Sequence, residues 1–228
     1  MNEYQMKGLL VICFVILTAI PLLAQRPAYG ILVDNTGSMR TQFDRELELA
    51  REVVKQLNDG TSISIFRFRK EDGPSKNAVV QAALHCTTDR ILLNKTIDEL
   101  YLLGGQTTLI DAVQGSADVL NTITERCGEY SERNLVLITD GEDRTSVEKL
   151  EDLVTSLKST KTRVFAIGLV GELDPAATAA AKSPQDKAKE LLINIAKETG
   201  GAVVFPTKDQ AASEIVRLMF NPNQRVLK

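Results

Sequence analysis

Four short apolar runs constrain the fold of this chain more than any other feature. They are YGILVD (29–34), NLVLITD (134–140), RVFAIGL (163–169) and AVVF (202–205). A strand with one face in solvent alternates apolar and polar residues, whereas a strand buried on both faces is apolar throughout. Segments with helical periodicity separate these runs, which is typical of a mostly parallel sheet covered by helices.

Two further segments complete the predicted sheet. SISIFRFR (62–69) is another strand, and NAVVQAAL (77–84) follows it closely enough to pair antiparallel at the edge. The predicted fold is therefore α/β: a doubly wound, Rossmann-like, mostly parallel six-stranded sheet with one antiparallel edge strand and helices on both faces.

Helices are predicted where apolar residues recur at spacings of three and four. One covers residues 40–58, and another begins at Leu109 after the Gly104-Gly105 turn. Thr145 and Glu148 form a capping-box pattern before a third helix.

Two more helices are predicted near the C-terminus. Ser183-Pro184 opens the first, and Gly200-Gly201 closes it. The last helix covers residues 207–220, with Thr207 and Gln210 as candidate caps.

The first two dozen residues differ from the rest of the chain. Residues 8–24 are apolar, follow a short polar segment containing Lys7, and end in small residues at a possible cut after Ala24. This is the pattern of an export signal, although the run also reaches the lower limit of length for a membrane-spanning helix. We predict that residues 1–24 are a signal peptide or an N-terminal membrane anchor. Residues 25–228 would then form one exported domain, periplasmic or secreted.

The charge balance bears on possible partners. The chain has 27 basic and 30 acidic residues, a net charge of −3, and no long basic stretch. Nucleic acid binding needs a positive footprint, so no nucleic acid partner is expected. Contact with a membrane is expected only through residues 8–24, if they are not cleaved.

The cysteines and the single histidine do not predict a zinc site. Cys13 lies in the leader, which leaves Cys86 and Cys127. They could pair in an oxidising compartment, but two cysteines in a domain of this size are more often free and buried, and we expect free thiols. His85 and Cys86 together are too few ligands for zinc.

Three polar motifs fall at corresponding places in the predicted sheet. DNTGSM (34–39) follows the first buried strand, GGQTT (104–108) precedes a helix, and ITDGED (138–143) ends a central strand. Loops at the carboxyl ends of parallel strands meet at one rim of a doubly wound sheet, where ligands bind. Asp34 and Asp140 should therefore lie near each other.

The residue types in these motifs predict a divalent metal site. The candidate ligands are Asp34, Thr36, Ser38, Thr107 and Asp140. A set of carboxylates and hydroxyls suits Mg²⁺, or Mn²⁺ or Ca²⁺, better than zinc or copper. Two adjacent carboxylates repel each other unless a cation or a proton lies between them. Protein groups seldom fill the whole Mg²⁺ shell, which leaves a position for the carboxylate of a partner.

The three motifs together resemble the metal-ion-dependent adhesion site (MIDAS) of von Willebrand factor A domains of the integrin inserted-domain type. The resemblance covers roughly residues 28–220. It implies that Thr36 and Ser38 bind the metal directly and that Asp34 and Asp140 act largely through water. It favours Thr107 over Thr108 as the threonine ligand. Thr36 departs from the serine that is more common in the family, but it keeps the hydroxyl.

This resemblance implies a binding module and not an enzyme. The expected function is metal-dependent binding of a protein ligand, through an Asp or Glu side chain that completes the metal shell. No histidine, nucleophile elbow or P-loop accompanies the motifs. One alternative is a Mg²⁺-dependent phosphohydrolase with Asp34 as the nucleophile, although Thr36 stands where such enzymes carry a second aspartate. Another is a scaffold whose metal is purely structural.

Overall fold

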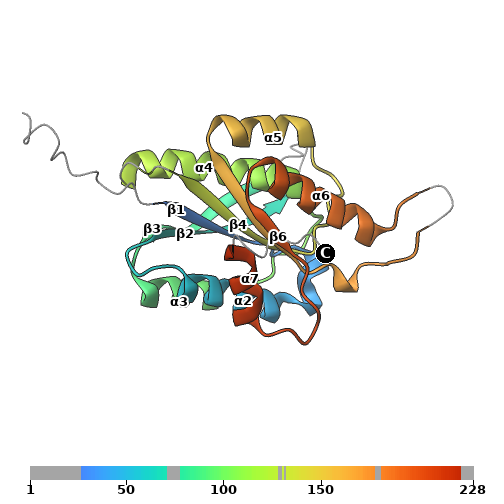
Figure 1. Ribbon diagram of the computed structural model, residues 1–228, viewed down its shortest axis with the longest axis horizontal. Helices are drawn as coiled ribbons and strands as arrows, with labels where there is room; N and C mark the ends of the chain where they lie inside the picture. The colour runs from blue at the N-terminus through green and yellow to red at the C-terminus, as the bar shows by residue number, and fades with distance from the viewer. Residues whose placement is uncertain (1–26, 71–77, 128–129, 131, 178–180, 222–228) are drawn as a thin grey trace, which may run out of the picture.

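A computed structural model describes residues 27–70, 78–127, 130, 132–177 and 181–221. Six strands form one sheet in this part of the chain (Figure 1). They are β1 (Ala28–Val33), β2 (Ser62–Lys70), β3 (Ala78–Thr87), β4 (Arg133–Thr139), β5 (Thr162–Gly168) and β6 (Ala202–Val204). Each of the six predicted strands is present, and the predicted fold class is confirmed.

The strand order places β1 and β4 at the centre of the sheet. The order is β3-β2-β1-β4-β5-β6, with every pair parallel except the antiparallel edge pair of β2 and β3. Val33, the last residue of β1, lies opposite Ile138 of β4. The residues that follow these two strands therefore leave the sheet side by side. Such a switch point is where ligands bind in doubly wound folds.

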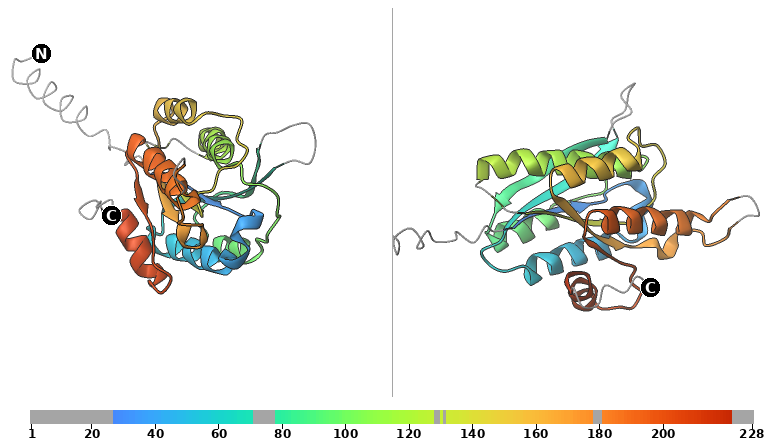
Figure 2. Two further views of the ribbon diagram at one scale, coloured as in Figure 1. Left: turned by 90° about the vertical axis from the view of Figure 1, so that its right-hand side faces the viewer. Right: turned by 45° about the horizontal axis from the view of Figure 1, so that its top comes forward.

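Helices cover both faces of the sheet (Figures 1 and 2). They are α2 (Phe43–Gln56), α3 (Arg90–Asp98), α4 (Leu109–Cys127), α5 (Leu150–Ser159), α6 (Pro184–Glu198) and α7 (Ala212–Phe220), with the short 3-10 helices η1 (Gly37–Thr41) and η2 (Val170–Glu172). The helices α2, α3 and α7 pack on one face, and α4, α5 and α6 on the other.

The apolar strands supply residues to both layers. Ile31 and Val33 of β1 belong to one core cluster, while Leu32 belongs to the other. All three are fully buried. This double burial is the physical reason for the continuous apolar runs in the sequence.

Two predicted helix starts are wrong. The capping box of Thr145 and Glu148 does not form, because α5 begins at Leu150 and the Glu148 amide instead donates to Asp111 (2.9 Å). The last helix begins at Ala212, after a turn in which the Gln210 amide donates to the Thr207 carbonyl (3.2 Å). The first competing hydrogen bond is a tertiary contact with helix α4, and the second is a local bond of the backbone.

One helix was not predicted. The nine-residue α3 begins after Asp89, whose side chain accepts hydrogen bonds from the amides of Ile91 (2.9 Å) and Leu92 (3.0 Å). The other predicted capping signal is confirmed, since Ser183 accepts a hydrogen bond from the Asp186 amide (3.0 Å) at the start of α6.

The expectation of free thiols is wrong. Cys86 of β3 and Cys127 at the end of α4 form a disulfide, with their Cα atoms 6.5 Å apart. Helix α4 packs so closely on the edge strand that a Cβ on Gly115 would lie 2.9 Å from a methyl group of Val80. This tertiary contact brings two cysteines together that are 41 residues apart in the sequence.

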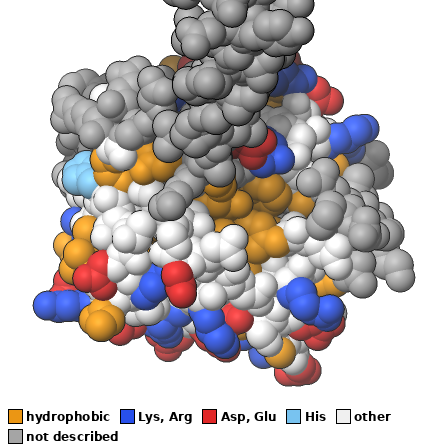
Figure 3. Space-filling view, turned by 60° about the vertical axis from the view of Figure 1, so that its left-hand side comes forward, with side chains coloured by type: hydrophobic (Ala, Val, Ile, Leu, Met, Phe, Trp, Pro, Cys, Tyr) orange, Lys and Arg blue, Asp and Glu red, His pale blue; other side chains and the backbone are white. Residues whose placement is uncertain are grey.

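The predicted leader, residues 1–24, lies outside the described residues. Among the helices that are described, none has the length and apolarity needed to cross a membrane. The side of the molecule where β1 begins shows a gathering of hydrophobic side chains between charged ones (Figure 3). The polar motifs of the sequence lie at the opposite ends of the parallel strands.

Candidate metal centre

The loop after β1 holds its polar side chains inside the molecule. Asp34 and Thr36 are both fully buried. Asp34 Oδ1 accepts hydrogen bonds from the Thr36 hydroxyl (2.7 Å) and the Thr36 amide (3.2 Å). Asp34 Oδ2 accepts one from the hydroxyl of Thr139, the last residue of β4 (2.5 Å). Asp34 is therefore fixed both by its own loop and by the neighbouring strand.

Three hydroxyls converge next to Asp34. Thr36 Oγ1 lies 3.0 Å from Thr107 Oγ1 and 3.3 Å from Ser38 Oγ, and the latter two oxygens are 3.4 Å apart. Thr107 comes from the loop before α4, far from the other two in sequence. Its neighbour Thr108 is also buried, but its hydroxyl contacts none of these groups and has no hydrogen-bond partner among the described residues.

Asp140 completes this group from the end of β4. It is 1% exposed, its Oδ1 accepts the Glu142 amide (2.9 Å), and the Ser38 hydroxyl also donates to it. Gly141 then turns the chain with φ of +78°, and a Cβ there would lie 2.9 Å from Leu192 of α6. The structure thus brings all five predicted site residues together at the carboxyl ends of β1 and β4.

Backbone hydrogen bonds hold the Thr107 loop against the other two motifs. The Arg144 amide donates to the Thr107 carbonyl (3.0 Å), and the Gly37 amide donates to the Gly105 carbonyl (3.4 Å). Gly104 and Gly105 have φ of +75° and +85°, a region in which residues with a side chain are strained. The double glycine therefore allows the turn that brings Thr107 to the cluster.

Two polar side chains that connect these loops to neighbouring segments by hydrogen bonds were not predicted from the sequence. The buried Asn35 accepts a hydrogen bond from the Phe68 amide at the end of β2 (3.3 Å) and donates to the Tyr101 carbonyl (3.3 Å). Asp143 caps α4 by accepting the Leu109 amide (2.7 Å). Asp143 thereby connects the β4 loop to the helix that follows Thr107.

A third missed residue is Glu46 of α2. It is fully buried, and its Oε1 accepts a hydrogen bond from the Asp34 amide. Its Oε2 has no hydrogen-bond partner among the described residues. The sequence does contain a signal for it. Glu46 lies three residues after Phe43 and four before Ala50, within the stripe that packs on the sheet.

The three buried carboxyl groups have an unusual electrostatic environment. Burial, and then the negative charge of Asp140, raises the pKa of Asp34 to about 7. Burial, and then the charge of Asp34, raises the pKa of Glu46 well above its ordinary value. Burial also raises the pKa of Asp140, against the effect of its hydrogen bonds. None of the ion pairs among the described residues includes any of the three.

The donor set fits a hard divalent cation. The described residues contain no group of three His, Cys, Asp or Glu side chains able to hold a metal by themselves. Ligands at this rim would therefore have to include hydroxyls, and three hydroxyls converge here beside two carboxylates. Hydroxyl and carboxylate oxygens are the ligands that Mg²⁺, Mn²⁺ and Ca²⁺ prefer.

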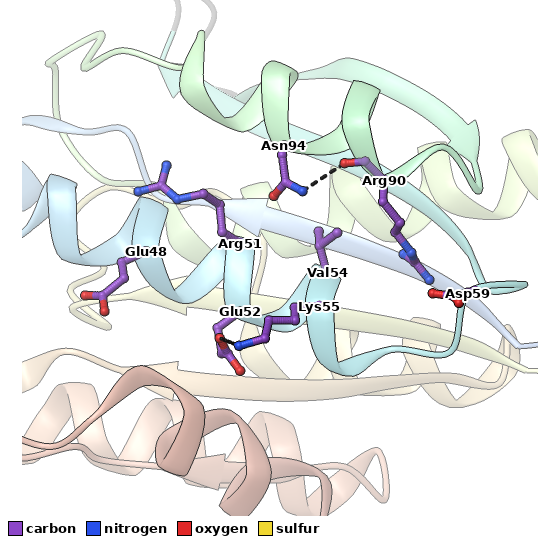
Figure 4. A pocket seen from close by; sticks show the side chains of 8 residues that line it. All are labelled: Glu48, Arg51, Glu52, Val54, Lys55, Asp59, Arg90 and Asn94. Atoms are coloured by element: carbon purple, nitrogen blue, oxygen red, sulfur yellow. Dashed lines mark hydrogen bonds and ion pairs between the residues drawn. The ribbon is translucent and has the colours of Figure 1, made fainter.

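A second polar region contains none of the predicted site residues. It is a groove of about 440 Å³ between α2 and α3 (Figure 4). Its lining is Glu48, Arg51, Glu52, Val54, Lys55, Asp59, Arg90 and Asn94. The groove lining has equal numbers of acidic and basic side chains. The buried charged groups at the rim are all carboxyl groups.

Comparison with known proteins identifies the fold family. The family model for the von Willebrand factor type A domain matches residues 30–218. The chain belongs to this family. VWA domains are generally non-enzymatic adhesion or assembly modules, and they commonly bind a divalent metal at the MIDAS. A search among curated proteins gives no match.

Solved structures of other proteins share the fold at low sequence identity. An aerotolerance-related membrane protein from Bacteroides fragilis is 16% identical, with a TM-score of 0.57 over 88% of this chain and 98% of that one. A von Willebrand factor type A protein from Catenulispora acidiphila is 19% identical, with a TM-score of 0.60 over 86% of this chain and 42% of that one.

A mussel byssus protein also shares the fold. Proximal thread matrix protein 1, in a structure with a zinc-occupied MIDAS motif, is 16% identical. Its TM-score is 0.62 over 87% of this chain and 48% of that one. This VWA domain therefore spans about half the length of the mussel protein and less than half of the Catenulispora protein.

Proposed function

We propose that this VWA domain binds one divalent cation through a MIDAS and uses it to bind a protein ligand. The observation that carries the proposal is the convergence of three hydroxyls beside two buried carboxyl groups that have no basic ion-pair partner among the described residues. Buried charges of one sign are costly unless an opposite charge or a proton compensates them. A divalent cation would compensate them directly.

The residues that would hold the cation are Asp34, Thr36, Ser38, Thr107 and Asp140. Mg²⁺ is the expected ion, with Mn²⁺ or Ca²⁺ as substitutes, because every donor is an oxygen. When bound, the cation supplies an incompletely filled shell that can accept a carboxylate. The partner is therefore expected to be a protein that presents an Asp or Glu side chain.

The geometry of Asp34 favours binding over phosphoryl transfer. A nucleophilic aspartate needs an oxygen that can reach phosphorus. Asp34 is fully buried, and both its oxygens accept hydrogen bonds, from Thr36 and from Thr139. These contacts fix the loop and leave Asp34 poorly placed for attack on phosphorus, so the phosphohydrolase alternative is the weaker one.

Export is the second part of the proposal. Residues 1–24 would act as a signal peptide or a membrane anchor, and residues 25–228 would function outside the cytoplasm, in the periplasm or secreted. The disulfide between Cys86 and Cys127 supports this assignment, because such bonds persist mainly in oxidising compartments.

The direct test is calorimetric titration of the folded domain with Mn²⁺ and Mg²⁺. The wild-type domain should bind one ion, whereas Asp34→Ala and Ser38→Ala should bind it much more weakly. The matched control is Asp59→Ala, which removes an exposed carboxylate from the α2–α3 groove. Equal affinities in all four proteins would rule out the proposed site.

The protein ligand is tested by capture from the extracytoplasmic fraction, with and without EDTA. Capture should be lost with EDTA and restored by added Mg²⁺. Metal-dependent stability combined with metal-independent capture would instead support the scaffold alternative, in which the cation is only structural.

A further inference from the structure

Glu46 occupies a position where α2 should carry an apolar residue. It lies on the buried face of this helix, in the same stripe as Phe43, Leu47 and Ala50. Besides Asp34 and Asp140, it is the one charged residue with a fully or almost fully buried side chain among the described residues. Burial of a carboxyl group is unfavourable without compensating contacts, so helix packing alone does not account for it. Local conflicts of this kind occur mainly at functional or strained positions.

The contacts of Glu46 point to the loop that carries the candidate ligands. Its Oε1 accepts a hydrogen bond from the amide of Asp34. That amide also faces the Ile138 carbonyl of β4, at 3.2 Å. The contact with Ile138 continues the sheet, whereas the contact with Glu46 comes from the helix layer. Glu46 thus bonds to the chain where β1 ends and the loop begins.

The position of Asp34 determines the position of Thr36. Asp34 Oδ1 accepts both the amide and the hydroxyl of Thr36, and that hydroxyl lies 3.0 Å from Thr107. A shift of Asp34 would therefore move the hydroxyls that are expected to bind the cation. The second oxygen of Glu46, which has no partner among the described residues, lies at the same buried boundary between helix and loop.

We propose that Glu46 is a positioning residue of the metal site: its carboxyl oxygen holds the Asp34 amide and thereby fixes the Asp34–Thr36–Thr107 arrangement without touching the cation. This inference rests on the proposed function. It also makes a claim about the metal-free protein, namely that the loop after β1 depends on an acceptor at residue 46.

The test uses two substitutions of similar volume in the exported domain. Glu46→Gln keeps an oxygen that can accept the Asp34 amide, and Glu46→Met does not. The matched controls are Glu48→Gln and Glu48→Met on the exposed side of the same helix, where the Glu48 side chain is 52% exposed. Mn²⁺ affinity is measured by calorimetry, and amide hydrogen exchange of Thr36 is measured without metal.

Glu46→Met should weaken Mn²⁺ binding at least tenfold and speed Thr36 amide exchange at least tenfold. The amides of Ile31 and Leu137, in the central strands, should exchange as in the wild-type protein and show that the fold persists. Glu46→Gln should stay within about threefold of wild type in both measurements. Both Glu48 variants should behave as wild type.

Wild-type affinity and exchange in Glu46→Met would overturn the inference, as would a Glu46→Gln variant as impaired as Glu46→Met. If Glu46→Met does not fold, comparison of Glu46→Gln with Glu46→Ser still decides it, because serine is too short to reach the Asp34 amide. A wild-type domain that binds no Mn²⁺ would contradict the proposed function. The exchange measurement would then still test Glu46 separately.

Discussion

The rim of the sheet and the groove between α2 and α3 both gather charged side chains, but they compensate those charges differently. At the rim, Asp34, Glu46 and Asp140 are buried and take part in none of the ion pairs among the described residues. In the groove, Arg51 pairs with Asp98 (2.7 Å), a residue of α3 beside the groove lining. The side chains of this pair are 40% and 61% exposed.

The two regions compensate their charges differently because their side chains differ in exposure to water. Water screens the exposed Arg51–Asp98 pair, so these two side chains need no added ligand to be stable. The buried carboxyl groups at the rim have no ion-pair partner among the described residues, so hydrogen bonds, protons or a cation must compensate their charge. Charge alone therefore does not mark a binding site in this VWA domain. Under the proposed function, the mark of the site is burial of like charges without an ion-pair partner.

The largest expected difference between a rim variant and a groove variant is in metal affinity. Asp34→Ala should weaken Mn²⁺ binding at least about 100-fold, or about 2.8 kcal/mol, because it removes a buried carboxylate and the acceptor of the Thr36 hydroxyl. Asp59→Ala in the groove should leave the affinity unchanged within about twofold. Calorimetry measures both. A loss of similar size in the two variants would mean that long-range charge, and not the rim, governs cation binding.

Cation binding should also stabilise the fold. A ligand that binds only the folded state, present at about 100 times its Kd, stabilises by about 2.7 kcal/mol. Thermal or urea unfolding with and without Mn²⁺ measures this, with EDTA as the reversal. Asp34→Ala should abolish the increment, and Asp59→Ala should retain it. An identical increment in both variants would indicate cation binding elsewhere on the surface.

The proximity of the candidate site residues was predictable from the sequence, because two of them lie at the ends of neighbouring strands. The apolar runs predict which strands are central, and parallel strands bring their carboxyl ends to one rim. Asp34 and Asp140 directly follow two such strands. Their proximity could therefore be predicted without knowledge of the loop structure. The glycines at 104 and 105 indicated the turn that brings Thr107 to them.

The supporting residues were harder to predict, since their roles depend on contacts between layers. The side chain of Asn35 joins β2 to the Tyr101 loop, two segments that lie far from it in the sequence. Glu46 was not among the predicted site residues, although its place in the apolar stripe is visible in the sequence. The pairing of Cys86 with Cys127 depends on how closely α4 packs on β3, which no local pattern contains.

A pH titration of Mn²⁺ affinity provides a further test of the electrostatic difference between the rim and the groove. The pKa of Asp34 is raised from 3.8 to about 7, mainly by burial, so the folded metal-free protein holds a proton that the unfolded chain releases above about pH 4. The stability that this proton contributes is fully present below about pH 4 and is lost as the pH rises through about 7. Cation binding requires the carboxylate, so the Mn²⁺ affinity should rise about tenfold from pH 6 to pH 8.

The control for the pH titration is Asp34→Asn, whose residual metal affinity should change much less over this interval. The groove variant Asp59→Ala should follow the wild-type curve. A wild-type affinity that does not change between pH 6 and pH 8 would contradict the raised pKa of Asp34 and, with it, the electrostatic difference between rim and groove.

The smallest expected effect concerns the groove itself. A double-mutant cycle with Arg51→Ala and Asp98→Ala should give a coupling energy of about 0.2–1 kcal/mol, because both side chains are well exposed. The coupling should shrink in about 1 M salt, where screening acts over a few ångströms. Urea unfolding of the four proteins measures it. A coupling above about 2 kcal/mol that resists salt would mean that the groove, like the rim, holds charges away from water, and burial would no longer distinguish the two regions.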